Sequence, residues 1–309
     1  MKKIFIDGSA GTTGLRIFER LSSRTDITLL TLPEELRKDT ASRARALNEA
    51  DIAILCLPDA AAREAVSLIE NPDTVVLDTS TAHRTAPGWV YGFPELSPAH
   101  AAAIRTAKRI AVPGCHASGF IALTAPLRAA GILPAGTLLS CFSLTGYSGG
   151  GKKMIAEYEA EPQPASLHAP RQYALGQSHK HLPEMAAVSG LPAPVFCPVV
   201  GDFYSGMQVT VPLFAAQCAP GAAKETVAQL YRETYRGPVV RFTETPDEGG
   251  FLSAASLAGK DSMRISVSGN EERMLLLAVY DNLGKGASGA ALECLNMILG
   301  ADPCEGLCL

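Results

Sequence analysis

A glycine-rich turn between a short apolar segment and a helix restricts the fold of this chain more than any other feature. The turn Gly8-Ser9-Ala10-Gly11-Thr12-Thr13-Gly14 follows the apolar residues 3–7 directly and opens the helical pattern of residues 12–21. Glycines allow a tight turn and let the backbone approach a pyrophosphate, which then binds at the helix N-terminus. The GxxGxxG spacing is a variant of the dinucleotide fingerprint. It predicts a dinucleotide site; the alternative is a glycine-rich turn without a ligand.

The first third of the chain alternates short apolar segments with helical ones. The predicted strands are residues 3–7, 27–32, 52–57 and 75–78, and the predicted helices are 12–21, 41–48 and 60–69. Continuous apolar strands separated by helices favour a parallel sheet that is covered on both faces. We therefore expect an N-terminal Rossmann-like α/β domain.

The pattern changes after residue 115. The predicted strands are now 137–144, 195–200, 207–214, 239–242, 263–267 and 273–280, with a helix at 222–235. Several of these strands alternate polar and apolar residues, which suits an antiparallel sheet with one exposed face. We expect a second, α+β domain with a mostly antiparallel sheet, and an amphipathic helix at 287–299 that packs on the first domain. The predicted division is 1–115 plus 285–309 for dinucleotide binding, and 116–284 for catalysis, substrate binding and oligomerisation.

Composition excludes several classes of protein. The formal net charge is -4, so the composition gives no indication of a basic surface that would bind nucleic acid or an anionic membrane. No apolar stretch reaches membrane-spanning length, and a strand begins too early for a signal peptide. The 8 cysteines form no CxxC pair, so we expect a reducing, cytoplasmic location without disulfides. The tail 302–309, with Cys304 and Cys308, shows no pattern, and we expect a disordered end.

Cys115 is the candidate nucleophile. It follows Val112-Pro113-Gly114 and precedes the helical segment Phe120-Ile121-Ala122-Leu123, so its thiol is expected on the first turn of a helix. The free N–H groups and the positive dipole end at that position favour a thiolate. The alternative is a buried cysteine that serves as a small apolar residue.

A thiolate that attacks a carbonyl needs a nearby proton carrier, most often histidine. His179 and His181 lie in a polar segment that predicts a loop, and in extended chain they would point to the same side. His116 is expected to point away from Cys115, since successive helical residues do not face each other. We predict no metal site, because no third ligand stands at suitable spacing from the histidine pair.

Three charged or glycine-rich segments suit anionic ligands. Arg84 follows the fourth strand at its carboxyl end, where it could clamp a carboxylate or phosphate. A second glycine-rich turn, 146–153, contains Ser148 and Gly149 and forms a plausible anion nest. Arg37 and Lys38 follow the second strand, where they could meet the 2′-phosphate of NADP. Solvated turns and a solvated charge cluster are the alternatives.

Taken together, these motifs resemble the short form of the N-acetyl-γ-glutamyl-phosphate reductase family and, more distantly, aspartate-semialdehyde dehydrogenases. The resemblance covers nearly the whole chain. Its marks are the turn 8–14, the segments 78–84 and 91–96, Pro113-Gly114-Cys115, the turn 146–151, the segment His179-Lys180-His181-Leu182-Pro183-Glu184, and 281–287. The spacing of the glycine loop and the region after the second strand differ from those of the longer form of the family. The family's contacts to the 2′-phosphate therefore do not transfer directly to residues of this chain.

The resemblance implies an NADP-dependent oxidoreductase of arginine biosynthesis that reduces N-acetyl-L-glutamyl 5-phosphate to the semialdehyde. Cys115 would form a thioester, and His179 or His181 would carry the proton. Arg84, Ser148 and Gly149 would bind substrate, Asn282 would lie near the nicotinamide, and a homo-oligomer, dimer or tetramer, is implied.

Two other functions remain open at this point. The chain could reduce a related acyl phosphate, as aspartate-semialdehyde dehydrogenase does. It could also be a non-catalytic dinucleotide-binding module, against which the thiol, the histidine pair and the anion-binding turns all argue.

Overall fold

The computed structural model describes residues 1–246 and 248–309. The chain divides into two compact units. The first unit comprises 1–94, 99–114 and 290–306, and the second comprises 95–98, 115–289 and 307–309. Among the described residues, no helix combines the length and the apolar character that a membrane span requires.

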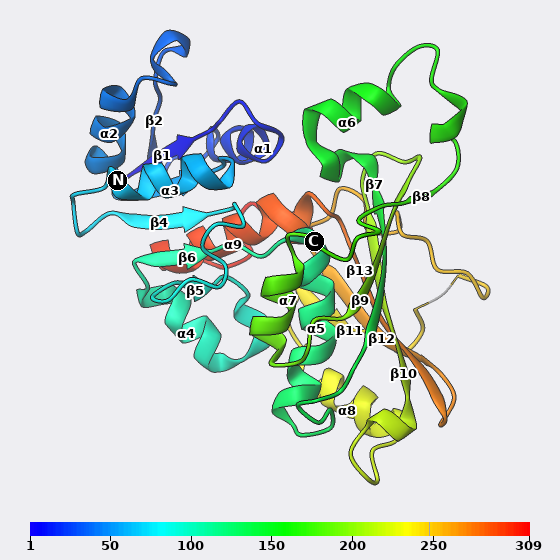
Figure 1. Ribbon diagram of the computed structural model, residues 1–309. Coiled ribbons are helices and arrows are strands. Elements are labelled where there is room, and N and C mark those ends of the chain that lie inside the picture. The colour runs from blue at the N-terminus through cyan, green and yellow to red at the C-terminus, as the bar shows by residue number, and fades with distance from the viewer. Residues whose placement is uncertain (247) are drawn as a thin grey trace. The chain divides into compact units, whose positions relative to one another are not determined.

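The first unit contains a six-stranded parallel sheet with the strand order β2-β1-β3-β4-β6-β5 (Figure 1). Its strands are β1 (Lys2–Asp7), β2 (Ile27–Leu30), β3 (Ile52–Leu55), β4 (Val75–Asp78), β5 (Val90–Tyr91) and β6 (Arg109–Ala111). Its helices are α1 (Thr12–Leu21), α2 (Thr40–Glu49), α3 (Asp59–Ser67), α4 (Pro98–Thr106) and α9 (Gly289–Leu299). The predicted Rossmann-like α/β arrangement is confirmed. All four residues of β3 are buried, which is why that strand is continuously apolar.

The second unit contains a seven-stranded sheet with the strand order β11-β12-β13-β10-β7-β9-β8. Its strands are β7 (Ser140–Gly146), β8 (Arg171–Gln172), β9 (Val195–Gly201), β10 (Met207–Phe214), β11 (Val240–Phe242), β12 (Met263–Gly269) and β13 (Arg273–Tyr280). Its helices are α5 (Cys115–Ala129), α6 (Gly151–Tyr158), α7 (Leu182–Ser189) and α8 (Lys224–Thr234). Most neighbouring strands are antiparallel, whereas β7 pairs with β9, and β11 with β12, in parallel. The α+β prediction is therefore confirmed.

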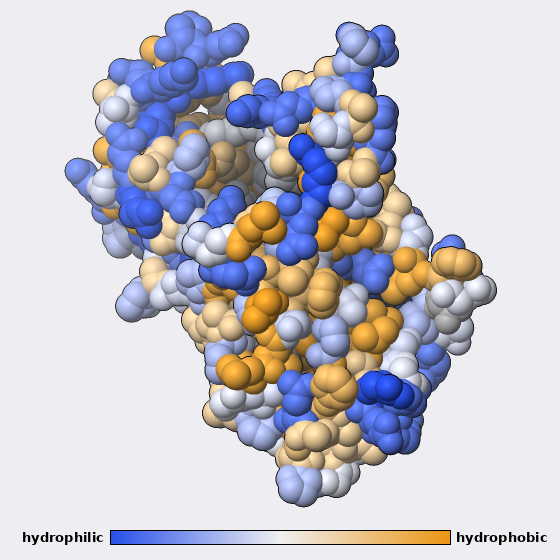
Figure 2. All heavy atoms as spheres, turned by 45° about the vertical axis from the view of Figure 1, so that its right-hand side comes forward, coloured by the Kyte–Doolittle hydropathy of each residue, from blue (hydrophilic) through white to orange (hydrophobic). Residues whose placement is uncertain are grey.

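One face of this second sheet is covered and the other is exposed. Helices α5, α7 and α8 lie together on one side (Figure 1). On the opposite face, Phe142, Val195 and Leu275 are 49%, 58% and 41% exposed. Figure 2 brings this sheet forward and shows hydrophobic side chains gathered on it. Adjacent residues of a strand face opposite sides of the sheet. The alternation of polar and apolar residues in the sequence therefore reflects one covered face and one exposed face.

Three local predictions need correction. Strand β7 begins at Ser140 rather than Thr137, because the Thr137 N–H and hydroxyl both donate to the Pro134 carbonyl in a turn. Helix α9 begins at Gly289, after a π-helical turn at Gly284–Ser288. The tail is not a disordered end, since the Cys308 N–H donates to the Asp261 carboxylate at 2.8 Å.

Candidate active site

Cys115 is the first residue of α5 and is half-buried. Its position on the opening turn of a helix agrees with the prediction from sequence. The hydroxyl of Tyr280, at the end of β13, donates to the Cys115 carbonyl at 2.5 Å and accepts from the Gly119 N–H at 3.0 Å. A Cβ on Gly119 would lie 2.7 Å from this hydroxyl. Tyr280 thus braces the turn that carries the thiol, and only glycine leaves room for it.

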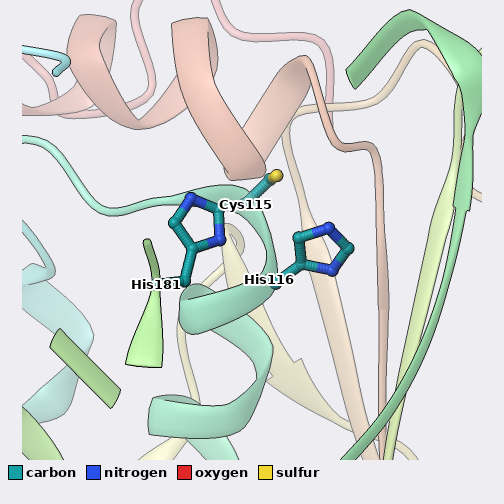
Figure 3. Close-up of side chains that lie close together, drawn as sticks. All are labelled: Cys115, His116 and His181. Carbon is teal, nitrogen blue, oxygen red and sulfur yellow. The ribbon is translucent and has the colours of Figure 1, made fainter. Parts of the chain in front are cut away.

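His116 lies beside the candidate nucleophile rather than away from it, which corrects the expectation drawn from helical geometry. The ligand atoms of Cys115, His116 and His181 all lie within 4.8 Å of one another (Figure 3). His116 is buried, and its two ring nitrogens lie 2.6 Å from the hydroxyls of Ser143 and Tyr173. Burial is the main reason that its pKa falls to about 3. The ring is therefore neutral and held at both nitrogens.

The predicted histidine pair lies against His116. The ring centroids of His179 and His181 are each 5.5 Å from that of His116 and 4.7 Å from each other. His179 precedes α7, and its Nδ1 accepts the His181 N–H at 3.2 Å. Burial, with the charge of Lys180, lowers the pKa of His179 to about 4. A folded loop, not extended chain, brings the two rings together.

His181 is the buried member of the pair. It stands at the N-terminus of α7, and its Nε2 lies 3.9 Å from Oε1 of Glu184, whose side chain is also buried. A carboxylate at this distance from an imidazole helps to orient the ring. The sequence motif contained Glu184, but sequence reasoning gave it no role.

Asn282, Ser148 and Gly149 are brought together at one end of the second sheet. The Asn282 amide donates to the Ser148 hydroxyl and accepts the Gly206 N–H, both at 2.9 Å. A Cβ on Gly149 would lie 3.4 Å from Nδ2 of Asn282. The predicted second turn is present, as a 3-10 turn at Tyr147–Gly150 that runs into α6. Asn282 therefore fixes this turn.

Arg84 braces a loop of the first unit. Its guanidinium donates to the carbonyls of Val112 and Thr79, both at 2.9 Å. The same loop is fixed by the buried Asp78, whose carboxylate accepts from the Ser80 hydroxyl at 2.7 Å and lies 2.6 Å from Nδ1 of His83. The role of Arg84 in substrate binding stays a prediction.

The glycine loop has the geometry of a dinucleotide site. Gly8 has a φ of +89°, and a Cβ there would lie 2.4 Å from the Cys56 carbonyl oxygen; a Cβ on Gly14 would lie 2.3 Å from the Gly8 oxygen. Helix α1 has no side-chain cap at Gly11 and no acidic residue in its first turn, whereas the Asp39 side chain caps α2. The first turn of α1, including Thr12 and Thr13, thus presents backbone N–H groups that suit a pyrophosphate.

The remaining cofactor candidates lie past the end of β2. Arg37 and Lys38 are exposed and follow a 3-10 turn at Glu34–Leu36. Exposed cations there can meet a 2′-phosphate without losing an existing buried partner. The donor types and the glycine cradle therefore fit NADP.

Comparisons with known proteins agree with this geometry. Residues 3–104 match the family described as "Semialdehyde dehydrogenase, NAD binding domain", and residues 115–282 match "Semialdehyde dehydrogenase, dimerisation domain". The chain is 47% identical to the N-acetyl-gamma-glutamyl-phosphate reductase of Rhizobium meliloti (strain 1021), covering 97% of this chain and 99% of that relative. It is 45% identical to N-acetyl-gamma-glutamyl-phosphate reductase 2 of Nostoc sp. (strain PCC 7120), covering 96% and 97%.

Solved structures share the fold at low identity. An aspartate semialdehyde dehydrogenase II from Vibrio cholerae matches with a TM-score of 0.70 at 17% identity, covering 97% of this chain and 98% of that one. An aspartate semialdehyde dehydrogenase with NADP from Candida albicans matches with a TM-score of 0.70 at 16% identity, covering 97% and 99%. By its sequence over nearly its full length, this chain belongs to the semialdehyde dehydrogenase family and, within it, to the N-acetyl-γ-glutamyl-phosphate reductases.

Proposed function

We propose that this chain reduces N-acetyl-L-glutamyl 5-phosphate with NADPH to N-acetyl-L-glutamate 5-semialdehyde and phosphate, in arginine biosynthesis. The observation that carries the proposal is the grouping of Cys115 with His181 at the start of α5, in a chain 47% identical to a named reductase of this kind. A thiol and an imidazole within reach of each other are the two groups that acyl transfer to cysteine requires.

In the first step Cys115 attacks the acyl carbon. His181 takes the thiol proton, and the N–H groups at the start of α5 stabilise the thiolate. The sulfur–carbon bond forms, the bond from the acyl carbon to the phosphate oxygen breaks, and phosphate leaves with that electron pair. The product is a thioester on Cys115.

In the second step the thioester is reduced. The acyl carbon would accept a hydride, which NADPH would supply when bound. His181 returns its proton as the carbon–sulfur bond breaks, so the aldehyde leaves and Cys115 is ready again. His181 serves as base and then as acid in this scheme, which suits an imidazole.

We assign the proton carrier to His181 rather than His179. His181 is the one that groups with Cys115 and His116, and Glu184 stands beside it. His179 accepts a backbone N–H through Nδ1, and burial keeps its pKa low. His116 has both nitrogens against hydroxyls, so it orients its neighbours instead of exchanging protons.

The remaining site residues are assigned to contacts with the substrate and the cofactor. Ser148 and Gly149, held by Asn282, offer the Ser148 hydroxyl and the Gly149 N–H to an anionic substrate. Arg84 is the proposed carboxylate or phosphate clamp, and Arg37 and Lys38 are the proposed contacts to the 2′-phosphate of NADP.

The protein is proposed to work as a homo-oligomer, a dimer or tetramer. The exposed face of the second sheet, with Phe142, Val195 and Leu275 uncovered, belongs to the part that matches a dimerisation domain. Contiguous exposed apolar surface of this kind favours association. Light scattering should report an oligomer, and Phe142→Glu should shift it toward the monomer.

The substrate assignment is tested by initial rates with three acyl phosphates: N-acetylglutamyl, aspartyl and aminoadipyl phosphate. We expect the highest kcat/KM with the N-acetylglutamyl compound. Preference for aspartyl phosphate would overturn the assignment. If the protein binds NADPH in a fluorescence titration but turns over none of the three compounds, it is a dinucleotide-binding module.

A further inference from the structure

We propose that Cys115, His181 and His116 form a site for a soft divalent cation such as Zn²⁺, and that an ion bound there blocks the nucleophile reversibly. The inference goes beyond the proposed function. It depends only on where these three side chains lie, and not on which acyl phosphate the protein accepts.

One ligand atom from each residue lies within 4.8 Å of the others. In Figure 3 the two imidazole rings stand on either side of the Cys115 side chain, which comes from the start of α5 together with His116. Zinc–sulfur and zinc–nitrogen bonds of about 2.3 and 2.1 Å require ligand atoms roughly 3.5 Å apart. Because the three ligand atoms lie within 4.8 Å of one another, side-chain rotations that shorten their separations by up to about 1.3 Å bring them to that spacing.

The donor types favour zinc over harder ions. Thiolate and imidazole are the ligands that Zn²⁺ prefers, whereas Mg²⁺ and Ca²⁺ prefer oxygen. Three protein ligands leave a fourth tetrahedral position for water. The ion would occupy the sulfur lone pair that attacks the acyl carbon, so it would compete with the acyl phosphate.

The surroundings of His181 support this site independently. The buried Glu184 carboxylate lies 3.9 Å from Nε2 of His181. A carboxylate beside one nitrogen of a histidine that ligates metal through the other is a common outer-shell arrangement, and it raises the basicity of the ligand.

The three ligands are not equivalent. Both nitrogens of His116 already face hydroxyls, those of Ser143 and Tyr173. An ion must displace one of these hydroxyls before His116 can bind it. We therefore expect Cys115 and His181 to supply most of the affinity, and His116 the smaller part.

The test uses Co²⁺ as a spectroscopic substitute for Zn²⁺, added to the full-length protein after treatment with a chelator. We expect a saturable thiolate-to-cobalt absorption with a stoichiometry of one, which Zn²⁺ abolishes by displacement. Cys115→Ser should remove the absorption. His181→Asn should weaken binding at least about 10-fold, because even outer-shell partners matter that much, and His116→Asn should weaken it less.

Matched controls separate the site from the other thiols and imidazoles. Cys308→Ser and His168→Asn change residues that are exposed, and both should leave the cobalt spectrum unchanged. Cys115→Ala and protein alkylated at Cys115 repeat the sulfur test by other means, in case one variant folds poorly.

The proposal is overturned if the wild-type protein shows no thiolate–cobalt absorption at millimolar Co²⁺, or if Cys115→Ser keeps it. Because no substrate is present, the outcome is separate from the reductase assay. A cobalt spectrum without turnover would support the metal site and contradict the proposed function, and the reverse result would do the opposite.

Discussion

The Cys115 site and the glycine loop use different parts of the chain, side chains in the first and backbone groups in the second. At Cys115 the working groups are side chains, drawn from α5, β7, β13 and the segment before α7, and they are held by hydrogen bonds between residues up to 165 positions apart. In the glycine loop the working groups are backbone N–H groups within seven consecutive residues, and the essential feature is the lack of side chains. The first site should therefore fail when an atom is removed, and the second when an atom is added.

The largest effect is expected from removing the proposed proton carrier. His181→Asn should lower kcat by about 10²–10⁴-fold, the usual contribution of general acid–base catalysis, and should flatten one limb of the pH–rate profile. His179→Asn is the matched comparison, and we expect a smaller loss from it. A larger loss in His179→Asn would exchange the two assignments.

Adding a methyl group should damage the glycine loop in a different way. In Gly14→Ala the new Cβ would meet the Gly8 oxygen at 2.3 Å, whereas nothing lies within 4 Å of a Cβ on Gly136. We expect NADPH to bind at least about 10-fold more weakly to Gly14→Ala, a loss of about 1.4 kcal/mol, with Gly136→Ala unchanged. Alkylation of Cys115 should proceed at the wild-type rate in both. Equal NADPH affinity in Gly14→Ala and wild type would contradict the claim that the glycine loop holds the dinucleotide.

Tyr280→Phe removes one oxygen atom from the brace under Cys115. The loss of about 1–1.5 kcal/mol of hydrogen bonding should reduce kcat about 10-fold and leave KM little changed. Tyr235 is the matched control, since its buried hydroxyl donates to the Ala122 carbonyl on the same helix at 2.6 Å. Tyr235→Phe should lower stability without changing kcat. An equal loss of kcat in both variants would reduce Tyr280 to a structural role.

The last prediction concerns acid sensitivity, an effect on stability and not on catalysis. The pKa of His116 is about 3 in the folded protein and near 6.5 when unfolded, so the unfolded chain binds more protons between these values. The free energy of unfolding should therefore fall as pH drops from about 6.5 toward 3, by up to about 1.4 kcal/mol per pH unit. Urea denaturation at several pH values should give a shallower slope for His116→Asn. An unchanged slope would mean that His116 does not remain neutral.

Much of the fold was predictable because its signals are local. The turn 8–14, the first four strands of the first sheet and the start of α5 follow from residues within one helix or loop, and they begin close to where the patterns predict, whereas β5 and β6 were not predicted. The predicted start of strand β7 was wrong because Thr137 donates back to the Pro134 carbonyl in a turn. The alternation of polar and apolar residues contains no signal for that turn.

The partners of the candidate site were not predictable from spacing. Tyr280 reaches Cys115 across 165 positions, and Ser143 reaches His116 across 27, so only the assembled sheet brings them together. The one local signal was Gly119, whose missing side chain makes room for the Tyr280 hydroxyl. The direction of the His116 ring was predicted wrongly because helical spacing does not account for the hydroxyls of other segments that hold the ring.

The most direct measurement is the mass of the protein quenched after mixing with N-acetylglutamyl phosphate in the absence of NADPH. The mechanism predicts one acyl group per chain, located by peptide mapping on Cys115, absent from Cys115→Ala and discharged by NADPH. An unmodified Cys115 in an enzyme that is turning over, or full turnover by Cys115→Ala, would contradict covalent catalysis.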